Sequence, residues 1–219
     1  MYYSPIFKIK FIMDINTTDL FKKTPTEHEV HDLIKNRWSP RTFSDQPVSQ
    51  KELQVLFEAG RWAPSSSNLQ PWNIVWGIKG SEAYDRIMNV LVEFNQKWAK
   101  NAPVLLLGVV NTKTAKGDDN YHAPHDLGSF SANMALQAQS MGIAFHQMAG
   151  LDFEKAKKEF KFPDTYHVAT AIAVGYYGGE LSNVPDFLQE AETGERSRKK
   201  QNDFVFNGDY RETGDVKEE

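Results

Sequence analysis

The chain has 219 residues, of which 40% are hydrophobic and 25% are charged, so it can bury a sizeable core and is not disordered by composition. Its formal net charge of -4 argues against nonspecific nucleic-acid binding, which needs a strongly positive surface. The sequence contains no cysteine, which excludes disulfides, thiolate catalysis and cysteine-ligated metals.

Residues 1–26 are read as an N-terminal extension of uncertain order, and residues 27–219 as a single domain. The opening MYYSPIFKIKFIM is apolar, but Lys8 and Lys10 interrupt it and it lacks a small-residue cleavage site, unlike a signal peptide. Met13 is an alternative start, because the more regular sequence follows it. No run reaches the roughly 18 apolar residues of a membrane span, so we expect a cytoplasmic protein with no membrane partner.

Two helices are expected near the start of the domain. In EHEVHDLIKNRW the apolar residues recur on one helical face; they are Val30, Leu33, Ile34 and Trp38. The second helix begins in PVSQKELQVLFEAGRWAP, where Ser49 and Glu52 have the spacing of a capping box and Pro64 ends the helix. Its apolar residues are Leu53, Leu56 and Phe57.

Helices and strands then mix without a regular alternation. A polar loop, SSSNLQPW, precedes the β-rich NIVWGI, and one helix is expected over residues 81–99, with Ile87, Leu91 and Phe94 on one side. APVLLLGVVN is a continuous apolar run, which is typical of a strand buried on both faces. The polar KTAKGDDNYHAPH is expected to be a mobile surface loop.

The last third adds two helices with acidic caps and a second buried strand. Asp126 is expected to cap DLGSFSANMALQAQSMG, and Asp152 to cap DFEKAKKEF. FHQMAGLD is read as the connection between these helices, HVATAIAVGYYG as a strand, and DFVF near the C-terminus as a short β-like segment. This order predicts an α+β fold rather than a doubly wound sheet.

The segment NRWSPRTF gathers three donors, Arg37, Ser39 and Arg41. A guanidinium meets phosphate oxygens with paired, charge-assisted hydrogen bonds, and a serine hydroxyl with backbone N–H groups would complete a cradle. The alternative is an ordinary surface turn, because the pattern R-x-S-x-R recurs by chance.

Three other segments are candidates for ligand binding. APSSSNLQPW offers many donors and acceptors, held by its Pro-Trp pair at the rim of the sheet, although it can also be a plain hydrophilic connection. The glycine in FHQMAGLD allows backbone N–H groups to approach a planar ligand. The basic GERSRKK is either a solvated tail or, if it folds back beside Arg37 and Arg41, a part of the same site.

Other chemistries are disfavoured. His122 and His125 beside Asp126 suggest a metal, but helix capping by Asp126 and the loop setting explain them, so we assign no metal. No Gly-x-Gly-x-x-Gly follows a strand, and the sequence has no Walker loop and no Gly-x-Ser-x-Gly elbow. The chain therefore offers no hydrolytic triad and no separate Rossmann site for a nicotinamide.

Taken in order, these segments resemble the nitroreductase family of FMN-dependent oxidoreductases. The resemblance covers about residues 29–208 and rests on NRWSPRTFSDQPVS, APSSSNLQPWNIV, MAG after a small-residue helix, IAVGYYG and RSRK. It implies a nitroreductase-like mixed sheet flanked by helices, in an intertwined homodimer with one FMN in each of two sites at the interface.

The resemblance also implies roles for individual residues. Arg37 and Ser39 match the phosphate side of the site, and Arg41 matches a cation near the ribityl chain and the pyrimidine edge. Trp38, between them, is also carried over as a cofactor-binding position, with the role of holding these donors toward one side. The other positions carried over are the partner-contributed loop residues Pro64, Ser65, Ser66 and Asn68, the flavin-facing Asn95, the N5-edge residues Met148, Ala149 and Gly150, and the phosphate-closing pair Arg196 and Arg198. The family often has a lysine near the Asn95 position, and here Lys97 and Trp98 compete for that place.

The activity that the resemblance implies is a ping-pong exchange with no catalytic side chain. NAD(P)H, a transient donor, delivers hydride to tightly bound FMN and leaves, and a nitroaromatic, quinone or similar small acceptor then binds in the same place. Residues 112–124 are expected to help form the substrate mouth. Two alternatives remain open: a non-enzymatic flavin-binding module, or a same-fold enzyme of dehalogenation, dehydrogenation or flavin destruction.

Overall fold

The computed structural model describes residue 22 and residues 24–211, so most of the N-terminal extension expected over residues 1–26, including the alternative start at Met13, lies outside the described residues. The helices are α1 (Asp32–Asn36), α2 (Gln50–Arg61), α3 (Glu82–Val90), α4 (Glu93–Ala99), α5 (Ala123–Ser140), α6 (Phe153–Glu159) and α7 (Asp186–Thr193). The strands are β1 (Trp72–Ile78), β2 (Val104–Asn111), β3 (Ile143–Met148) and β4 (Tyr166–Tyr176). Three 3-10 turns, η2 (Ser66–Asn68), η3 (Leu181–Asn183) and η4 (Gln201–Asp203), complete the elements.

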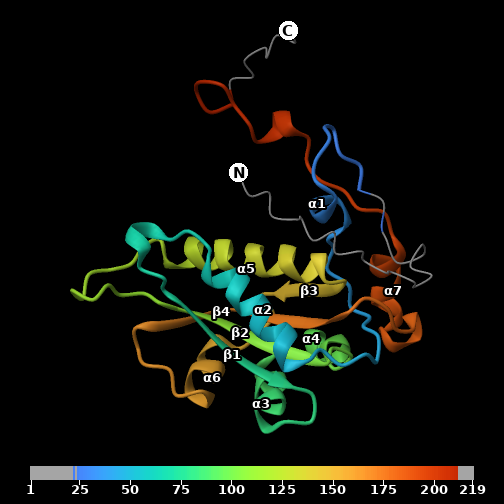
Figure 1. The fold of residues 1–219 in the computed structure, drawn as a ribbon, viewed down its shortest axis with the longest axis horizontal. Helices are drawn as coiled ribbons and strands as arrows, with labels where there is room; N and C mark the ends of the chain where they lie inside the picture. Colours follow the sequence, from blue (N-terminus) through green and yellow to red (C-terminus); the bar gives the residue numbers. More distant parts are fainter. Residues whose placement is uncertain (1–21, 23, 212–219) are drawn as a thin grey trace, which may run out of the picture.

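An antiparallel sheet in the order β1-β2-β4-β3 lies at the centre of the fold. Helices α2 and α5 cover one face of this sheet, and α3 and α6 cover the other (Figure 1). Strand β2 contributes to both cores, because Val104 and Leu106 pack with α2 and α5 while Leu105 and Leu107 pack with α3 and α6. The predictions of a doubly buried strand here and of an α+β fold are confirmed.

Helix α2 begins as its sequence predicts. The Ser49 hydroxyl accepts a hydrogen bond from Glu52 N, and the Glu52 carboxylate accepts one from Ser49 N at 2.7 Å, which completes the capping box. Leu53 and Leu56 then bury one face of the helix completely against the sheet. The Glu52 carboxylate also accepts a hydrogen bond from the Tyr176 hydroxyl, so the same residue ties the start of α2 to β4.

The prediction of a single helix over residues 81–99 is wrong, because two helices, α3 and α4, occupy this range. The chain leaves the helical conformation at Leu91, which pairs with Leu151 in an isolated antiparallel bridge. Val92 N donates to the Gly150 carbonyl at 3.1 Å, so the break joins the α3–α4 junction to the segment that follows β3. Helix α4 therefore starts anew beside Gly150, and Phe94, expected on the buried side, is 46% exposed.

Four other expectations need correction. The first helix is only α1, because the backbone is already extended at Arg37. Helix α5 begins at Ala123, so Asp126 lies in its first turn and is not the cap. The segment read as a connection after α5 contains the edge strand β3, and DFVF forms no strand, since Asp203 belongs to η4. The Asp152 cap is confirmed: its carboxylate accepts from Lys155 N at 2.9 Å.

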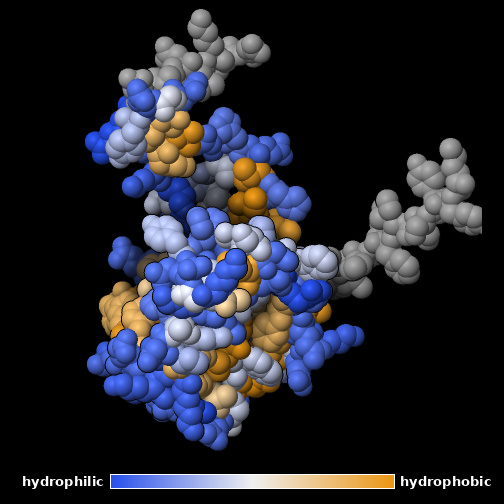
Figure 2. Space-filling model, turned by 90° about the vertical axis from the view of Figure 1, so that its left-hand side faces the viewer, coloured by the Kyte–Doolittle hydropathy of each residue, from blue (hydrophilic) through white to orange (hydrophobic). Residues whose placement is uncertain are grey.

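The C-terminal segment turns back toward the N-terminal part of the chain after α7. Residues 195–211 run beside α1 and away from the sheet (Figure 1), and Gln201 N donates to the Glu27 carboxylate at 3.3 Å. Phe204, Val205 and Tyr210 in this segment are exposed, and Figure 2 shows apolar atoms in the part of the molecule that rises above the body. In the described part of the chain, no helix has the length and apolarity required to cross a bilayer.

Candidate functional site

The segment from Arg37 to Arg41 alternates between buried and half-buried residues. Trp38 and Pro40 are buried, whereas Arg37, Ser39 and Arg41 are half-buried. Successive side chains of an extended backbone point to opposite sides, so burying the tryptophan and the proline turns the three donors to the other side. One Arg37 Nη donates to the Ser39 hydroxyl at 3.3 Å, which brings these two donors together.

Contacts with three elements fix this segment on the fold. The Trp38 ring stacks on Tyr177 at 6.2 Å between centroids, and the Tyr177 hydroxyl donates to the Gln139 side chain of α5 at 2.7 Å. His146 of β3 lies 2.8 Å from the Pro40 carbonyl through Nδ1. Because a carbonyl oxygen only accepts, that nitrogen carries the proton and donates. The donors therefore sit on a braced backbone.

Arg196, in the basic C-terminal segment, folds back onto the segment from Arg37 to Arg41. Its guanidinium donates to the Lys35 carbonyl at 2.6 Å and to the Arg37 carbonyl at 2.9 Å, and it also contacts the Thr24 hydroxyl. Arg196 thus caps the C-terminal carbonyls of α1 and holds the Arg37 backbone. Arg198 is exposed, and its hydrogen bond within the described residues goes to the Ser197 carbonyl.

Three arginines at this place lack an acidic partner. No carboxylate oxygen of the described residues lies within 4.0 Å of the guanidinium of Arg37, Arg196 or Arg198. Burial, followed by the charges of Arg37 and Arg198, lowers the pKa of Arg196. Gathered like charges without a counter-charge repel each other, and an anion of two negative charges would relieve that repulsion.

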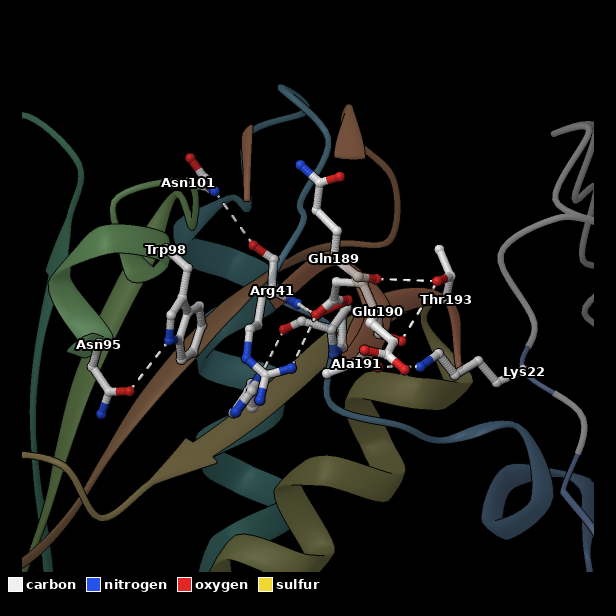
Figure 3. Close-up of polar contacts among 12 residues, drawn as sticks. Lys22, Arg41, Asn95, Trp98, Asn101, Gln189, Glu190, Ala191 and Thr193 are labelled. Carbon is white, nitrogen blue, oxygen red and sulfur yellow. Dashed lines mark hydrogen bonds and ion pairs between the residues drawn. The ribbon is translucent and has the colours of Figure 1, made fainter. Parts of the chain in front are cut away.

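Arg41 differs from these arginines because it is paired. Its backbone N–H donates to Glu192 Oε1 at 2.7 Å, and its Nη1 lies 3.3 Å from the same oxygen. Figure 3 shows Arg41 between Trp98 and the α7 residues around Glu190. The guanidinium carbon is 5.8 Å from the centroid of the Trp98 ring. Sequence reasoning missed Glu192, although its position four residues after Leu188, on the buried face of α7, is a signal in the pattern.

His146 is the second residue that sequence reasoning missed. Its ring is buried and lies 4.4 Å from the Trp98 ring. Burial lowers the pKa of His146 to about 4, and the charges of Arg41 and Arg37 act in the same direction while the Pro40 hydrogen bond opposes them. At neutral pH the imidazole is therefore uncharged and serves as a brace for the Pro40 carbonyl.

The stretch from Met148 to Gly150 reaches the same region through Asn95. The Asn95 amide donates to the Gly150 carbonyl at 2.9 Å and accepts from the Trp98 indole N–H at 3.2 Å. Lys97 points to solvent, paired with Glu93, so Trp98 and not Lys97 lies beside Arg41.

The glycine at position 150 has a steric reason in the fold. A Cβ at Gly150 would lie 2.5 Å from the Asn95 amide nitrogen, so the close approach of α4 requires the glycine. Asn95, Gly150 and Trp98 therefore form a connected wall beside Arg41. Ala149, between Met148 and Gly150, is exposed.

The serine loop lies apart from these residues within one chain. Ser66 N donates to the Asp126 carboxylate at 3.1 Å, in the first turn of α5, whereas Trp38 is tied through Tyr177 to Gln139, in the last turn. Thirteen residues of α-helix separate these anchors by about 20 Å. Pro64, Ser65, Ser66 and Asn68 therefore do not meet Arg37 and Arg41 of their own chain.

The serine loop is held in an unusual backbone conformation. Ser67, Asn68 and Gln70 have φ values of 49°, 54° and 47°, in the left-handed region of backbone conformation that residues other than glycine rarely adopt. The Ser65 hydroxyl accepts from Gln70 N at 3.1 Å, which closes the loop. Such conformations persist where the surrounding structure holds them, and they occur often in binding loops.

The histidines near Asp126 do not assemble a metal site in the described part of the chain, where no group of three potential ligands is close enough. The Asp126 carboxylate is instead engaged by Ser66 N, and His125 Nδ1 is 3.5 Å from its other oxygen. Residues 112–124, expected at the substrate mouth, lead into this same end of α5.

Comparison with known proteins gives consistent matches. The model of the nitroreductase family matches residues 34–176. A solved structure described as an oxidoreductase containing FMN is 33% identical and has a TM-score of 0.78; the match covers 85% of this chain and 95% of that protein. A Streptomyces coelicolor protein assigned as an NADH dehydrogenase/NAD(P)H nitroreductase is 26% identical over 163 residues, 63% of this chain and 78% of the relative. A nitrobenzene nitroreductase from Ectopseudomonas oleovorans is 45% identical over 69 residues, 32% of this chain and 30% of that protein.

Proposed function

Because the chain belongs to the nitroreductase family, we propose that it is an FMN-dependent oxidoreductase that passes hydride from NAD(P)H to a nitroaromatic, a quinone or a similar small acceptor. The reaction is a ping-pong exchange in which donor and acceptor use the same place in turn. The solved relative that contains FMN and the relatives named as nitroreductases support this proposal.

One observation carries the assignment of the cofactor to this surface. Arg37, Arg196 and Arg198 come together without an acidic partner among the described residues, beside the Ser39 hydroxyl. A phosphate monoester carries about two negative charges and three acceptor oxygens, which such a donor set fits. The buried Arg41 Nε also lacks a hydrogen-bond partner within the described chain, which leaves one further donor on the side of the segment that carries Arg37 and Ser39.

Bound FMN would supply the hydride chemistry, so that the protein needs no acid, base or nucleophile of its own. Arg37, Ser39 and the C-terminal arginines would hold the phosphate. Arg41 would lie at the pyrimidine edge, where its positive charge favours the negative charge that reduction places there. The backbone from Met148 to Gly150, held by Asn95, would line the edge of the ring system near N5.

The site that we propose is shared between two copies of the chain. The serine loop and residues 112–124 lie at one end of α5 and the arginines at the other, so one chain cannot bring them to one flavin. The exposed Phe204, Val205 and Tyr210 on the projecting C-terminal segment give a second chain an apolar surface to cover. An intertwined homodimer with two FMN sites satisfies both observations.

Two exposed aromatic rings favour a planar acceptor. Phe94 of α4 and Phe187 of α7 lie 5.7 Å apart between centroids, and they are 46% and 60% exposed. They project from the two helices that flank Arg41. Aromatic faces stack readily on planar conjugated rings.

The proposal is tested by anaerobic stopped-flow reduction of the purified protein with NADH and with NADPH, followed by a screen of nitroaromatic and quinone acceptors. We expect a yellow protein that either nicotinamide bleaches and an acceptor re-oxidises, with parallel lines in double-reciprocal plots. Bound FMN that neither nicotinamide reduces would instead identify a flavin-binding module without this activity. Turnover with halogenated or saturated substrates alone would identify a different flavin reaction on the same fold.

A further inference from the structure

Glu192 is a buried carboxylate next to a functional arginine. Its side chain is 3% exposed, and it lies with Leu188 on the buried face of α7. An ionised carboxylate in such a place loses much of its hydration, and burial accordingly raises the pKa of Glu192. An apolar residue would fill this face without losing hydration, so packing does not explain why a carboxylate is present.

The contacts of Glu192 are directed at one residue. Oε1 accepts both from the Arg41 backbone N–H, at 2.7 Å, and from Arg41 Nη1, at 3.3 Å. Asn101 Nδ2 lies 3.4 Å from the Arg41 carbonyl, and His146 donates to the carbonyl of the preceding Pro40. The peptide groups on both sides of Arg41 are thus held, and Trp98 packs against its guanidinium.

Two polar atoms of this arrangement remain unused. Glu192 Oε2 and Arg41 Nε are buried and have no hydrogen-bond partner within the described chain. A pair built only to stabilise the fold would use both carboxylate oxygens in the bidentate geometry that arginine favours. The single shared oxygen instead leaves part of the guanidinium free while its charge is partly compensated.

We propose that Glu192 is a positioning residue that fixes Arg41 toward the flavin and reduces the positive charge that Arg41 presents there, so that the carboxylate sets the reduction potential of the bound cofactor. The inference rests on the proposed function, because it needs FMN at the Arg41 surface. Its physical basis is that a counter-charge about 3 Å from a cation weakens the field of that cation on a third group, most strongly in a site of low dielectric. Arg41 favours the reduced cofactor, and Glu192 limits that preference.

The test replaces the charge and keeps the shape. Glu192→Gln retains an oxygen that can accept from the Arg41 backbone, at the same volume, but leaves the guanidinium uncompensated. We expect its FMN to be reduced more easily: the equilibrium constant for reduction against a reference dye, measured anaerobically, rises on the order of tenfold. Glu190→Gln, which removes the same charge from an exposed position of the same helix, leaves that constant unchanged.

A double-mutant cycle separates action through Arg41 from a direct effect of the carboxylate. Arg41→Met alone makes the FMN harder to reduce, and adding Glu192→Gln to it changes the constant less than Glu192→Gln does in the wild type, because Glu192 then has no cation to orient. A Glu192→Gln shift that persists unchanged in the Arg41→Met background overturns the proposal. So does an unchanged equilibrium constant in a Glu192→Gln protein that binds FMN and has the wild-type circular dichroism spectrum.

A variant that does not fold and a protein that binds no FMN also bear on the proposal. Should Glu192→Gln not fold, Glu192→Asp, which keeps the charge but withdraws it by one methylene, is expected to raise the constant by less than tenfold, and no change in it overturns the proposal. Wild-type protein that binds no FMN overturns the proposed function and this inference together. Bound and reducible FMN with no effect at Glu192 overturns this inference alone.

Discussion

Arg37 holds a half-buried positive charge beside Arg196 and a serine hydroxyl, with no carboxylate of the described chain to neutralise it. Arg37→Ala is therefore expected to weaken FMN binding by about 10- to 100-fold, the usual range for one charge-assisted contact. Fluorescence titration of the FMN-free protein measures this change. Arg61→Ala, which removes an arginine already paired with Glu58, is the matched control and leaves the affinity unchanged.

His146 makes the stability of the fold depend on pH. Its pKa in the folded protein is about 4, below the ordinary value near 6.5, so the unfolded chain binds the proton more readily. Stability is fully present above pH 6.5 and is lost as the pH falls toward 4, by roughly 3 kcal/mol from this group. In urea unfolding at a series of pH values, the free energy of unfolding of His146→Asn should fall by roughly 3 kcal/mol less than that of the wild type between pH 6.5 and 4.

The corresponding control is His122→Asn, which replaces an exposed histidine and keeps the wild-type slope. An identical decline in the wild type and in His146→Asn over the interval from pH 6.5 to 4 contradicts the buried, neutral imidazole.

At the level of elements, local patterns were sufficient for some features and not for others. The capping box of α2 and the apolar run of β2 are complete within a few residues, so the sequence predicts both. The break between α3 and α4 depends on a pairing of Leu91 with Leu151, sixty residues later, which no local pattern contains. Strand β3 was hidden because His146 and Gln147 interrupt its apolar run, and only pairing with β4 reveals it.

The same distinction applies to the site. Arg37, Ser39 and Arg41 stand close together in the sequence and could be proposed as a cluster. Glu192 is different: its spacing from Leu188 indicates a buried helical face, but the local pattern does not contain the docking of that face against Arg41, more than 150 residues earlier.

Helix α2 offers a test of an element by itself. Ser49→Ala removes the hydroxyl that accepts from Glu52 N, and the loss of such a cap costs about 1 kcal/mol. We expect a decrease of that size in the free energy of unfolding, measured by urea denaturation. Ser182→Ala, at an exposed position, provides the comparison and should change stability by less than about 0.5 kcal/mol. Equal losses in the two variants would mean that the capping box does not stabilise α2.

At the scale of the whole molecule, the shared site predicts complementation between two defective chains. Arg37→Ala impairs the arginine side of a site, and Asn68→Asp places a carboxylate in the serine loop, where aspartate tolerates the positive φ. Each variant alone should bind FMN weakly. In a heterodimer both changes fall in one site and the other site is intact, so refolding an equal mixture should restore about a quarter of the sites.

Titration of FMN into the refolded mixture counts the tight sites. A mixture that binds no better than its two components would show that each chain builds its site alone, and the proposal of a shared interface would then fail. A size-exclusion profile of the wild type, recorded beside it, gives the oligomeric state.

Helix α5 has a consequence that follows from its two anchors. Its last turn holds Tyr177 and Trp38 at the arginines, and its first turn holds the serine loop through Asp126. In the proposed dimer one rigid rod would thus belong to both cofactor sites. A shift of the helix as the first FMN enters would be felt by the second, so the two binding steps would not be independent. Cooperativity, of either sign, would be built into this scaffold.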